Sequence, residues 1–274
     1  MPSGFARVLD LERVAKSHFR SPADPDSGTH LYGGLVATQA LWAAATDIDP
    51  VYEPHSLQCS FLKAGRTDLP LDYHVEVLLD GRSFVNRRVD TRQEGALIFT
   101  ATISFQRHEE GPDLQLPVVP GVAGPDFTGD PGGPFGVEGP FTWAREFEYV
   151  SVPSDPPDTE RSPRTTMRYW VRSVGPLNDD PLASACALTF ASDMRAAGSA
   201  AEGVYRFIEG GVRVATVNHS IWFHRNAPPG EWMLVQNRAV SNGKNRGLVA
   251  GTIHHGDGTH LASYGQEVLV RKPL

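Results

Sequence analysis

The stretch HSIWF at residues 219–223 has a counterpart, HSLQCSFL, at residues 55–62, and this repetition guides the interpretation of the whole chain. The two His-Ser pairs are separated by 164 residues (219 − 55). A turn glycine follows each pair at a similar interval, and these two glycines, Gly95 and Gly258, are separated by 163 residues (258 − 95). A nearly constant offset indicates that one structural unit occurs twice in the chain.

The composition is compatible with two small domains. The chain has 274 residues, which fits one large domain or two small ones, and the repeat favours the second. Hydrophobic residues make up 40% and charged residues 21%, ordinary values for a chain that buries a core. The net charge of −7 argues against a nucleic acid as the main partner, because binding to phosphate backbones requires a basic surface.

Cysteine usage and apolar runs bear on the cellular setting. Cys59 and Cys186 lie in apolar contexts and have no metal-ligand or redox spacing, so we expect reduced thiols and a cytoplasmic location. Residues 1–10 lack the basic and apolar regions of a secretory signal. The longest apolar-rich stretch, residues 35–45, is much shorter than the roughly 20 residues that cross a membrane, so we expect no membrane partner.

Each copy is predicted to contain one helix followed by an antiparallel meander. Helices are expected at residues 35–46, which are rich in alanine, and at residues 181–196, where Asp180 can cap the first turn. We expect strands at residues 84–91, 96–105, 167–172, 247–253 and 259–270, with turns at Asp80-Gly81, Glu94-Gly95, Asn242-Gly243 and Asp257-Gly258. Such a unit belongs to the α+β class, in which the sheet wraps the helix.

A segment rich in Pro, Gly and Asp separates the two copies. It has no periodic apolar face, which is typical of a linker. We therefore predict an N-terminal unit at residues 1–110, a linker at residues 111–140 and a C-terminal unit at residues 141–274. A second loop of similar composition is expected at residues 152–163.

Several motifs resemble those of the acyl-CoA thioesterase II family, whose members are double-hotdog proteins. The resemblance covers about residues 9–271 and is carried by YGGLV (32–36), HSLQCSFL (55–62), DGRSF (80–84), RRV (87–89), ISFQ (103–106), FASD (190–193), ATVNHSIWFHR (215–225) and QE (266–267). It implies a double hotdog of two tandem units, each with a central helix wrapped by a curved antiparallel sheet.

The resemblance also implies a catalytic trio and a substrate. The family's catalytic residues correspond to Asp193, Thr216 and Gln266 here, and the implied substrate is acyl-CoA. Asp193 would take a proton from a water that Thr216 and Gln266 aim at the thioester carbonyl. None of the three is an activated nucleophile, so we expect direct attack by water without an acyl-enzyme, a metal or a cofactor. Gly34 and His55 are further candidates for contacts with the substrate.

The repeat gives a separate reason to place one site in the second copy or at the seam between copies. Subtraction of the offset matches Gln266 with Ile103 and Thr216 with Tyr52, so polar residues correspond to apolar or aromatic ones. A glutamine inside a buried strand pattern is costly unless its amide is used. Asn218 stands where the family usually has Asp, and we expect one negative charge fewer near the site. Because hotdog sheets pair edge to edge, a homo-oligomer is a further expectation.

The residues by themselves leave other interpretations open. Asp193 near a helix end could be a capping carboxylate, Thr216 an ordinary strand residue and Gln266 a satisfied core amide. The same fold could carry an acyl-thioester dehydratase or hydratase, for which His55 or His219 would be essential. A third alternative is a non-catalytic protein that binds acyl-CoA.

Four residues in a short stretch, His254, His255, Asp257 and His260, could suggest a metal site. The Gly-Asp-Gly between them predicts a hairpin turn, and strand alternation would place the rings on two faces. We therefore interpret this stretch as a solvated turn rather than as a metal centre.

Overall fold

A computed structural model of the protein describes residues 4–25, 31–129, 146–153, 166–175, 180–205, 212–228 and 230–272. The strands in these ranges are β1 (Glu12–Ala15), β2 (His18–Ser21), β3 (Tyr52–Phe61), β4 (Leu71–Asp80), β5 (Phe84–Gln93), β6 (Ala96–Arg107), β7 (Phe147–Val152), β8 (Thr166–Ser173), β9 (Arg213–Phe223), β10 (Met233–Gly243), β11 (Arg246–His255) and β12 (His260–Arg271). The helices are the short 3₁₀ helix η1 (Gly4–Arg7), α1 (Gly33–Ala45), α2 (Pro181–Asp193) and α3 (Ala196–Tyr205).

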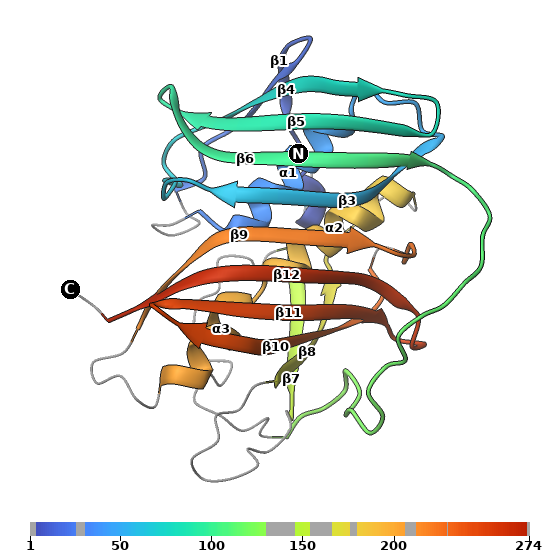
Figure 1. The fold of residues 1–274 in the computed structure, drawn as a ribbon, viewed down its shortest axis with the longest axis vertical. Helices are drawn as coiled ribbons and strands as arrows, with labels where there is room; N and C mark the ends of the chain where they lie inside the picture. The colour runs from blue at the N-terminus through green and yellow to red at the C-terminus, as the bar shows by residue number, and fades with distance from the viewer. Residues whose placement is uncertain are drawn as a thin grey trace.

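All twelve strands form one antiparallel sheet in the order β1-β2-β4-β5-β6-β3-β9-β12-β11-β10-β8-β7 (Figure 1). The first half of the chain supplies the strands from β1 to β3 in this order, and the second half supplies the rest. The halves meet where β3 pairs with β9 in the middle of the sheet. The sheet is therefore continuous across the boundary between the two copies.

The pairing of β3 with β9 also relates the two copies to each other. Leu57 lies opposite Ile221, and both side chains are fully buried. These residues are 164 apart (221 − 57), the same offset that separates the two His-Ser pairs. Equivalent residues that lie opposite each other in this way indicate a local two-fold axis between the copies.

The helices α1 and α2 pack against the sheet and against each other (Figure 1). α1 contacts β3, β4, β5 and β6, whereas α2 contacts β3, β9, β11 and β12. Most of both helices is buried, and their many alanines let the helices approach closely. Both helices contribute to the main core, together with large side chains such as Phe99, Phe105 and Tyr169 from the strands.

The expected strands and the first expected helix agree with the structure to within two residues, whereas one helix end and one turn lie elsewhere. The helix expected at residues 181–196 is wrong at its end, because α2 stops at Asp193 and Arg195 takes a left-handed backbone (φ 56°) before α3 begins. The turn expected at Asn242-Gly243 lies two residues later, because Lys244 and Asn245 have the positive φ angles (52° and 60°) that a tight hairpin needs.

The segment after β6 is not detached from the fold. Trp170 Nε1 donates a hydrogen bond to the carbonyl of Ala123 (2.7 Å), and the ring of His254 contacts the carbonyl oxygen of Leu116 (3.0 Å). Residues 108–129 contain no helix or strand, and the rest of the expected linker, like most of the loop expected at residues 152–163, lies outside the described residues. Of the helices in the described ranges, none has the length and apolar character to span a membrane.

Candidate active site

The three predicted catalytic residues meet at the side-chain amide of Gln266. The Nε2 atom of Gln266 donates to Oδ1 of Asp193 (2.8 Å) and to Oγ1 of Thr216 (2.8 Å). Gln266 is 0% exposed, and these two bonds use both of its amide hydrogens. Asp193 ends α2, Thr216 lies on β9 and Gln266 on β12, so the fold brings together three segments that are distant in sequence.

A β-bulge turns Thr216 toward this cluster. In the pairing of β9 with β12, Asn218 lies opposite Glu267 and Thr216 opposite Val268, so Val217 is an extra residue on β9. Without the bulge, regular alternation would point Thr216 to the face opposite that of His219 and Gln266. The bulge instead lets the Thr216 hydroxyl accept a hydrogen bond from Gln266.

The second oxygen of the Asp193 carboxylate lies against the amino end of α1. Oδ2 accepts a hydrogen bond from the backbone N–H of Gly34 (2.8 Å). Tyr32, which precedes the helix, makes no capping bond with its own side chain. Asp193 therefore caps α1 from the other half of the chain, and the positive end of the helix dipole favours its negative charge.

Other side chains approach Gly33 and Gly34 so closely that neither position has room for a Cβ atom. A Cβ atom on Gly33 would lie 2.8 Å from Oδ2 of Asp193 and 3.0 Å from the ring of Phe61. A Cβ atom on Gly34 would lie 2.6 Å from the ring of Tyr32. All three distances are shorter than normal van der Waals contact, so glycine at position 33 lets the carboxylate reach the helix end and glycine at position 34 leaves room for the ring of Tyr32.

Buried polar side chains hold the carboxyl end of α2 next to Asp193. The carbonyl of Met194 accepts hydrogen bonds from the Tyr169 hydroxyl and from Nδ2 of Asn237 (3.3 Å), and the Tyr264 hydroxyl donates to Oδ1 of Asn237. Burial raises the pKa of Tyr264, and the nearby negative charge of Asp193 raises it further. Sequence reasoning missed these residues, since no motif distinguishes them from ordinary strand positions.

His219 is a second residue that the predicted trio did not include. Its Nδ1 lies 2.9 Å from Oε1 of Gln266, and its Nε2 lies 2.9 Å from Oγ of Ser192. The ring is 2% exposed, and burial lowers the pKa of His219, although the charge of Asp193 and the bond to Gln266 act in the opposite direction. The repeated His-Ser pair was a signal for His219, whereas Ser192 lies in the FASD stretch at residues 190–193, where only Asp193 was assigned a role.

Two residues discussed with the site lie away from the trio. The ring of His55 contacts Oγ of Ser104 (2.7 Å). His219 lies opposite Cys59 on β3, and His55 precedes Cys59 by four residues, so His55 lies about 13 Å along the strand from His219. Asn218 is exposed and donates to Glu267 (3.2 Å) on the face of the sheet opposite to Gln266. The expectation that Asn218 removes a charge from the site is therefore wrong.

The counterpart of Gln266 in the first half also needs correction. Leu57 and Ile221 are equivalent, and their partners on the next strands are Ile103 on β6 and Tyr264 on β12. Ile103 therefore corresponds to Tyr264, and Phe105, two residues later, corresponds to Gln266. Bulges and unequal loops change the offset along the chain, so one subtraction gave a position two residues early. Phe105 is as buried and apolar as Ile103, so Gln266 has no polar equivalent in the first half.

The hairpin turn expected after His255 is present, and its Asp257 is exposed. However, His254 at the end of β11 and His260 at the start of β12 are buried rather than solvated. His254 and His260 lie opposite each other on the paired strands, and their rings stack with centroids 4.7 Å apart. They share a face because a register shift follows Ile253, and both are less than 7% exposed. Within the described ranges, no group of three or more His, Cys, Asp or Glu side chains is placed to hold a metal ion.

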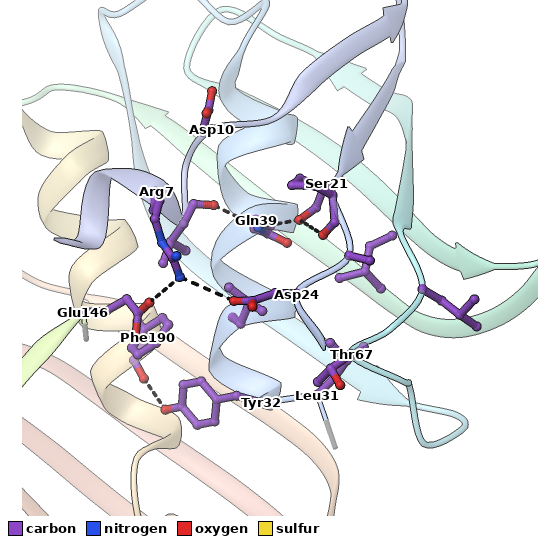
Figure 2. Close-up of a pocket in the computed structure, with 16 residues that line it drawn as sticks. Arg7, Asp10, Ser21, Asp24, Leu31, Tyr32, Gln39, Thr67, Glu146 and Phe190 are labelled. Carbon is purple, nitrogen blue, oxygen red and sulfur yellow. Dashed lines mark hydrogen bonds and ion pairs between the residues drawn. The ribbon is translucent and has the colours of Figure 1, made fainter. Parts of the chain in front are cut away.

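A cavity of about 320 Å³ lies near the site, between η1, β2 and α1 (Figure 2). Its apolar wall consists of Val8, Leu31, Leu35, Leu69, Leu71 and Phe190. Arg7 pairs with Glu146 (3.1 Å) and Asp24 (3.4 Å) on the polar side. The trio does not line this cavity, but Tyr32, which does, directly precedes Gly33 and donates a hydrogen bond to the carbonyl of Phe190 (2.6 Å).

Comparison with known proteins agrees with this architecture. Family models described as the acyl-CoA thioesterase N-terminal and C-terminal domains match residues 21–106 and 119–270. Acyl-CoA thioesterase 2 of Haemophilus influenzae is 30% identical over 274 residues, and the match covers 96% of each chain. The crystal structure of an acyl-CoA thioesterase II, TesB2, from Mycobacterium marinum superposes with a TM-score of 0.83 at 32% identity and covers 98% of this chain and 99% of that one.

A more distant structure shows the fold alone. A protein of unknown function with a hot dog fold from Alicyclobacillus acidocaldarius is 20% identical, with a TM-score of 0.79 and coverage of 98% of each chain. The fold is therefore of the hotdog type, built here as one large antiparallel sheet with few helices. With both family models and full-length relatives in agreement, the chain belongs to the acyl-CoA thioesterase family of thioester hydrolases.

Proposed function

We propose that this chain hydrolyses acyl-CoA to a free carboxylic acid and coenzyme A by direct attack of water. The observation that carries the proposal is the convergence of Asp193, Thr216 and Gln266 through two hydrogen bonds of 2.8 Å. Support for the substrate comes from the relatives, whose names describe them as acyl-CoA thioesterases. Asp193 and Thr216 are only partly buried, so part of each residue is accessible to water.

In the proposed reaction, Asp193 accepts a proton from the attacking water while the water oxygen forms a bond to the thioester carbon. The tetrahedral intermediate then expels the coenzyme A thiolate, and the proton held on Asp193 passes to that sulfur. Thr216 holds the water, because its hydroxyl already accepts from Gln266 and its own hydrogen is free to turn. Gln266 aligns Asp193 and Thr216, since both of its amide hydrogens are engaged by them.

The remaining expected contacts take different places in this scheme. The N–H of Gly34 is engaged by Asp193, so we propose that Gly34 acts on the substrate through that carboxylate. His55 lies at the other end of β3, and its contact with the substrate stays a prediction.

We also propose that the fold is a double hotdog with boundaries at residues 1–110, 111–140 and 141–274. The contacts of α1 with strands of the first half, and of α2 with β9, β11 and β12 of the second, support one central helix in each unit. Local two-fold pairing at Leu57 and Ile221 supports a duplicated unit. Expression of residues 1–110 and 141–274 as separate chains that then associate would test these boundaries.

The acyl chain is proposed to enter the cavity beside Tyr32 (Figure 2). Its wall of leucines and Phe190 offers apolar surface, and burial of each methylene group there gains about 0.8 kcal/mol. Leu35→Trp fills this space and should shift the preference toward shorter chains. Leu248→Trp, at an exposed position on β11, is the matched control and should leave the chain-length profile unchanged.

A thiol-release assay with acyl-CoAs of increasing chain length tests the reaction. Wild type should release free thiol, and Asp193→Ala should lose this activity. Undiminished turnover by Asp193→Ala would exclude the assigned site. Change at the acyl carbons without thiol release would favour the dehydratase or hydratase, and binding without either reaction would favour a non-catalytic acyl-CoA-binding protein.

Two further proposals concern the setting of the protein. A cytoplasmic location is supported by Cys59 and Cys186, which are both buried and unpaired, as thiols are in reducing compartments. A homo-oligomer stays a prediction, and sedimentation velocity would test it.

A further inference from the structure

His219 lies behind the trio, on the side of Gln266 away from Asp193. Its Nδ1 approaches Oε1 of Gln266, whereas Nε2 of the same amide faces Asp193 and Thr216. His219 is 2% exposed and both ring nitrogens have partners, so the ring has no atom left for a substrate. Its influence on the reaction therefore has to act through Gln266.

The orientation of the Gln266 amide depends on which nitrogen of His219 carries the hydrogen. When Nδ1 carries it, the ring donates to Oε1 and the NH₂ group points to Asp193 and Thr216. When only Nε2 carries it, Nδ1 is an acceptor and attracts the NH₂ group instead. The carbonyl oxygen of Gln266 would then face the carboxylate of Asp193, and two acceptors repel each other.

The Ser192 hydroxyl is the group that can bias the ring toward one of these two states. It is placed to donate to the carbonyl of Thr189 (2.9 Å) and also lies 2.9 Å from Nε2 of His219, so its single hydrogen can serve only one of these two acceptors. When the hydroxyl donates to Nε2, the hydrogen of the neutral ring must sit on Nδ1. When it donates to Thr189, the ring can carry its hydrogen on Nε2. Ser192 directly precedes Asp193 on α2, so the same helix end supplies the carboxylate and the group that directs the ring.

We propose that His219 is a positioning residue that, with Ser192, holds Gln266 in the one orientation that serves Asp193 and Thr216. The proposal rests on the proposed function for its effect on the reaction, but not for the state of the ring. It differs from the dehydratase interpretation, in which His219 would itself transfer a proton. A positioning role requires that Nδ1 of His219 always carries a hydrogen for Oε1 of Gln266, and it does not require the ring to gain or lose a proton during the reaction.

Kinetics of three variants test the effect on the reaction. His219→Leu removes the donor and should lower kcat about 10- to 100-fold with KM changed by less than about twofold, because the amide is misplaced while the substrate surface is intact. His219→Asn places an amide N–H near the former Nδ1 and should recover kcat to within about threefold of wild type. Ser192→Ala should cause a smaller loss than His219→Leu.

Nitrogen NMR of the ring gives a readout that does not depend on activity. With ¹⁵N-labelled histidine, wild type should show His219 with hydrogen on Nδ1 and a bare Nε2. The chain has ten histidines, so the signals of His219 are assigned by their loss in His219→Asn. In Ser192→Ala the signals should shift toward a mixture of both ring states.

These measurements distinguish failure of the positioning role from failure of the proposed function. Hydrogen on Nε2 alone in wild type, full kcat in a folded His219→Leu, or equal losses in His219→Leu and His219→Asn would each overturn the positioning role. If wild type releases no thiol from any acyl-CoA, the proposed function fails while the NMR measurement still decides the state of the ring. If His219→Leu does not fold, as judged by circular dichroism, His219→Asn and Ser192→Ala still decide the question.

Discussion

The amino ends of α1 and α2 are stabilised in two different ways. Asp180 caps α2 from the adjacent position, where its side chain accepts from the N–H of Ala183 (2.7 Å). α1 has no such local cap, and its Gly34 N–H donates to Asp193, 159 residues away in sequence. One cap thus serves its own helix alone, whereas the other joins the two halves and places a carboxylate at the candidate site.

This difference shows that one side chain, Asp193, both stabilises the amino end of α1 and belongs to the candidate site. A carboxylate at the end of α2 lies near the negative pole of that helix, which disfavours its charge. The amino end of α1 opposes this effect, because it presents a positive pole and a free N–H to the same group. The antiparallel contact of the two helices therefore gives the carboxylate at the end of α2 a donor, the N–H of Gly34, that α2 itself does not supply.

The largest effect is expected from Asp193→Asn. The asparagine oxygen can still accept from Gly34, but its NH₂ group then faces the NH₂ group of the buried Gln266, so the free energy of unfolding should fall by about 1–3 kcal/mol. The general base is lost, so kcat should fall about 10²- to 10⁴-fold. Thiol release and urea unfolding measure the two quantities, and Asp180→Asn is the matched control that should leave both unchanged. Wild-type kcat in Asp193→Asn would contradict the assignment of the base.

The next effect is expected from Gly33→Ala. The added methyl group would lie 2.8 Å from Oδ2 of Asp193, so the carboxylate has to move away from α1. We expect kcat to fall about 10- to 100-fold, because a displaced base is poorly aligned with the water. Gly198→Ala in α3, where an added Cβ meets nothing within 4 Å, is the control and should keep wild-type kcat. Equal activity of both variants would show that Asp193 need not contact α1.

A smaller effect, on stability alone, is expected from Asp180→Ala. Loss of the local cap of α2 should lower the free energy of unfolding by about 1 kcal/mol, within the range of 0.5–2 kcal/mol for such caps. The trio is not touched, so kcat should stay within about twofold of wild type. Urea unfolding and thiol release measure both quantities. A large loss of kcat would mean that the two helix ends are not as independent as the contacts suggest.

The smallest effect is expected on the pH dependence of stability, to which a buried histidine contributes in the second half but not at the corresponding turn of the first half. His260 of the β11–β12 hairpin stacks on His254, whereas the turn Glu94-Gly95 of the first half has no histidine. Burial, followed by the charges of His224 and His254, lowers the pKa of His260 to about 4, against about 6.5 in the unfolded chain. Between these values only the unfolded chain binds the proton, so His260 destabilises the fold as the pH falls from about 6.5 to about 4.

The measurement for this last prediction is the melting temperature at pH 7.5 and pH 4.5. His260→Gln should lose less stability than wild type between the two values, because glutamine binds no proton in either state. His108→Gln, at an exposed position after β6, is the control and should follow wild type. An equal loss in wild type and His260→Gln would show that other groups govern the acid response.

Sequence reasoning located the trio but not the residues that hold it in place. Asp193, Thr216 and Gln266 followed from motifs that resemble a family, and the structure brings all three together. Tyr169 and Asn237, which bind the carbonyl of Met194, came from no motif, because their roles depend on which side chains surround the end of α2. The catalytic roles of Asp193, Thr216 and Gln266 stay predictions until the variants are measured.

Local signals in the sequence determined part of the secondary structure. Alternation, turn residues and alanine content set five strands and α1 to within two residues, namely β5, β6, β8, β11 and β12, and the repeat indicated two copies of one unit. These properties depend on neighbouring residues, so they can be recognised without the fold. The same holds for the cap of α2, since Asp180 stands next to the helix that it caps.

Only the tertiary structure decided how the site is assembled. The bulge at Val217 determines that Thr216 faces Gln266, and the contact of α1 with α2 determines that Asp193 caps a helix of the other half. It also placed Asn218 on the outer face and His254 beside His260. The physical reason is that register shifts and helix contacts depend on packing between separate segments, 50 residues apart for Thr216 and Gln266 and 159 for Gly34 and Asp193. A change of one residue in register turns a side chain to the opposite face.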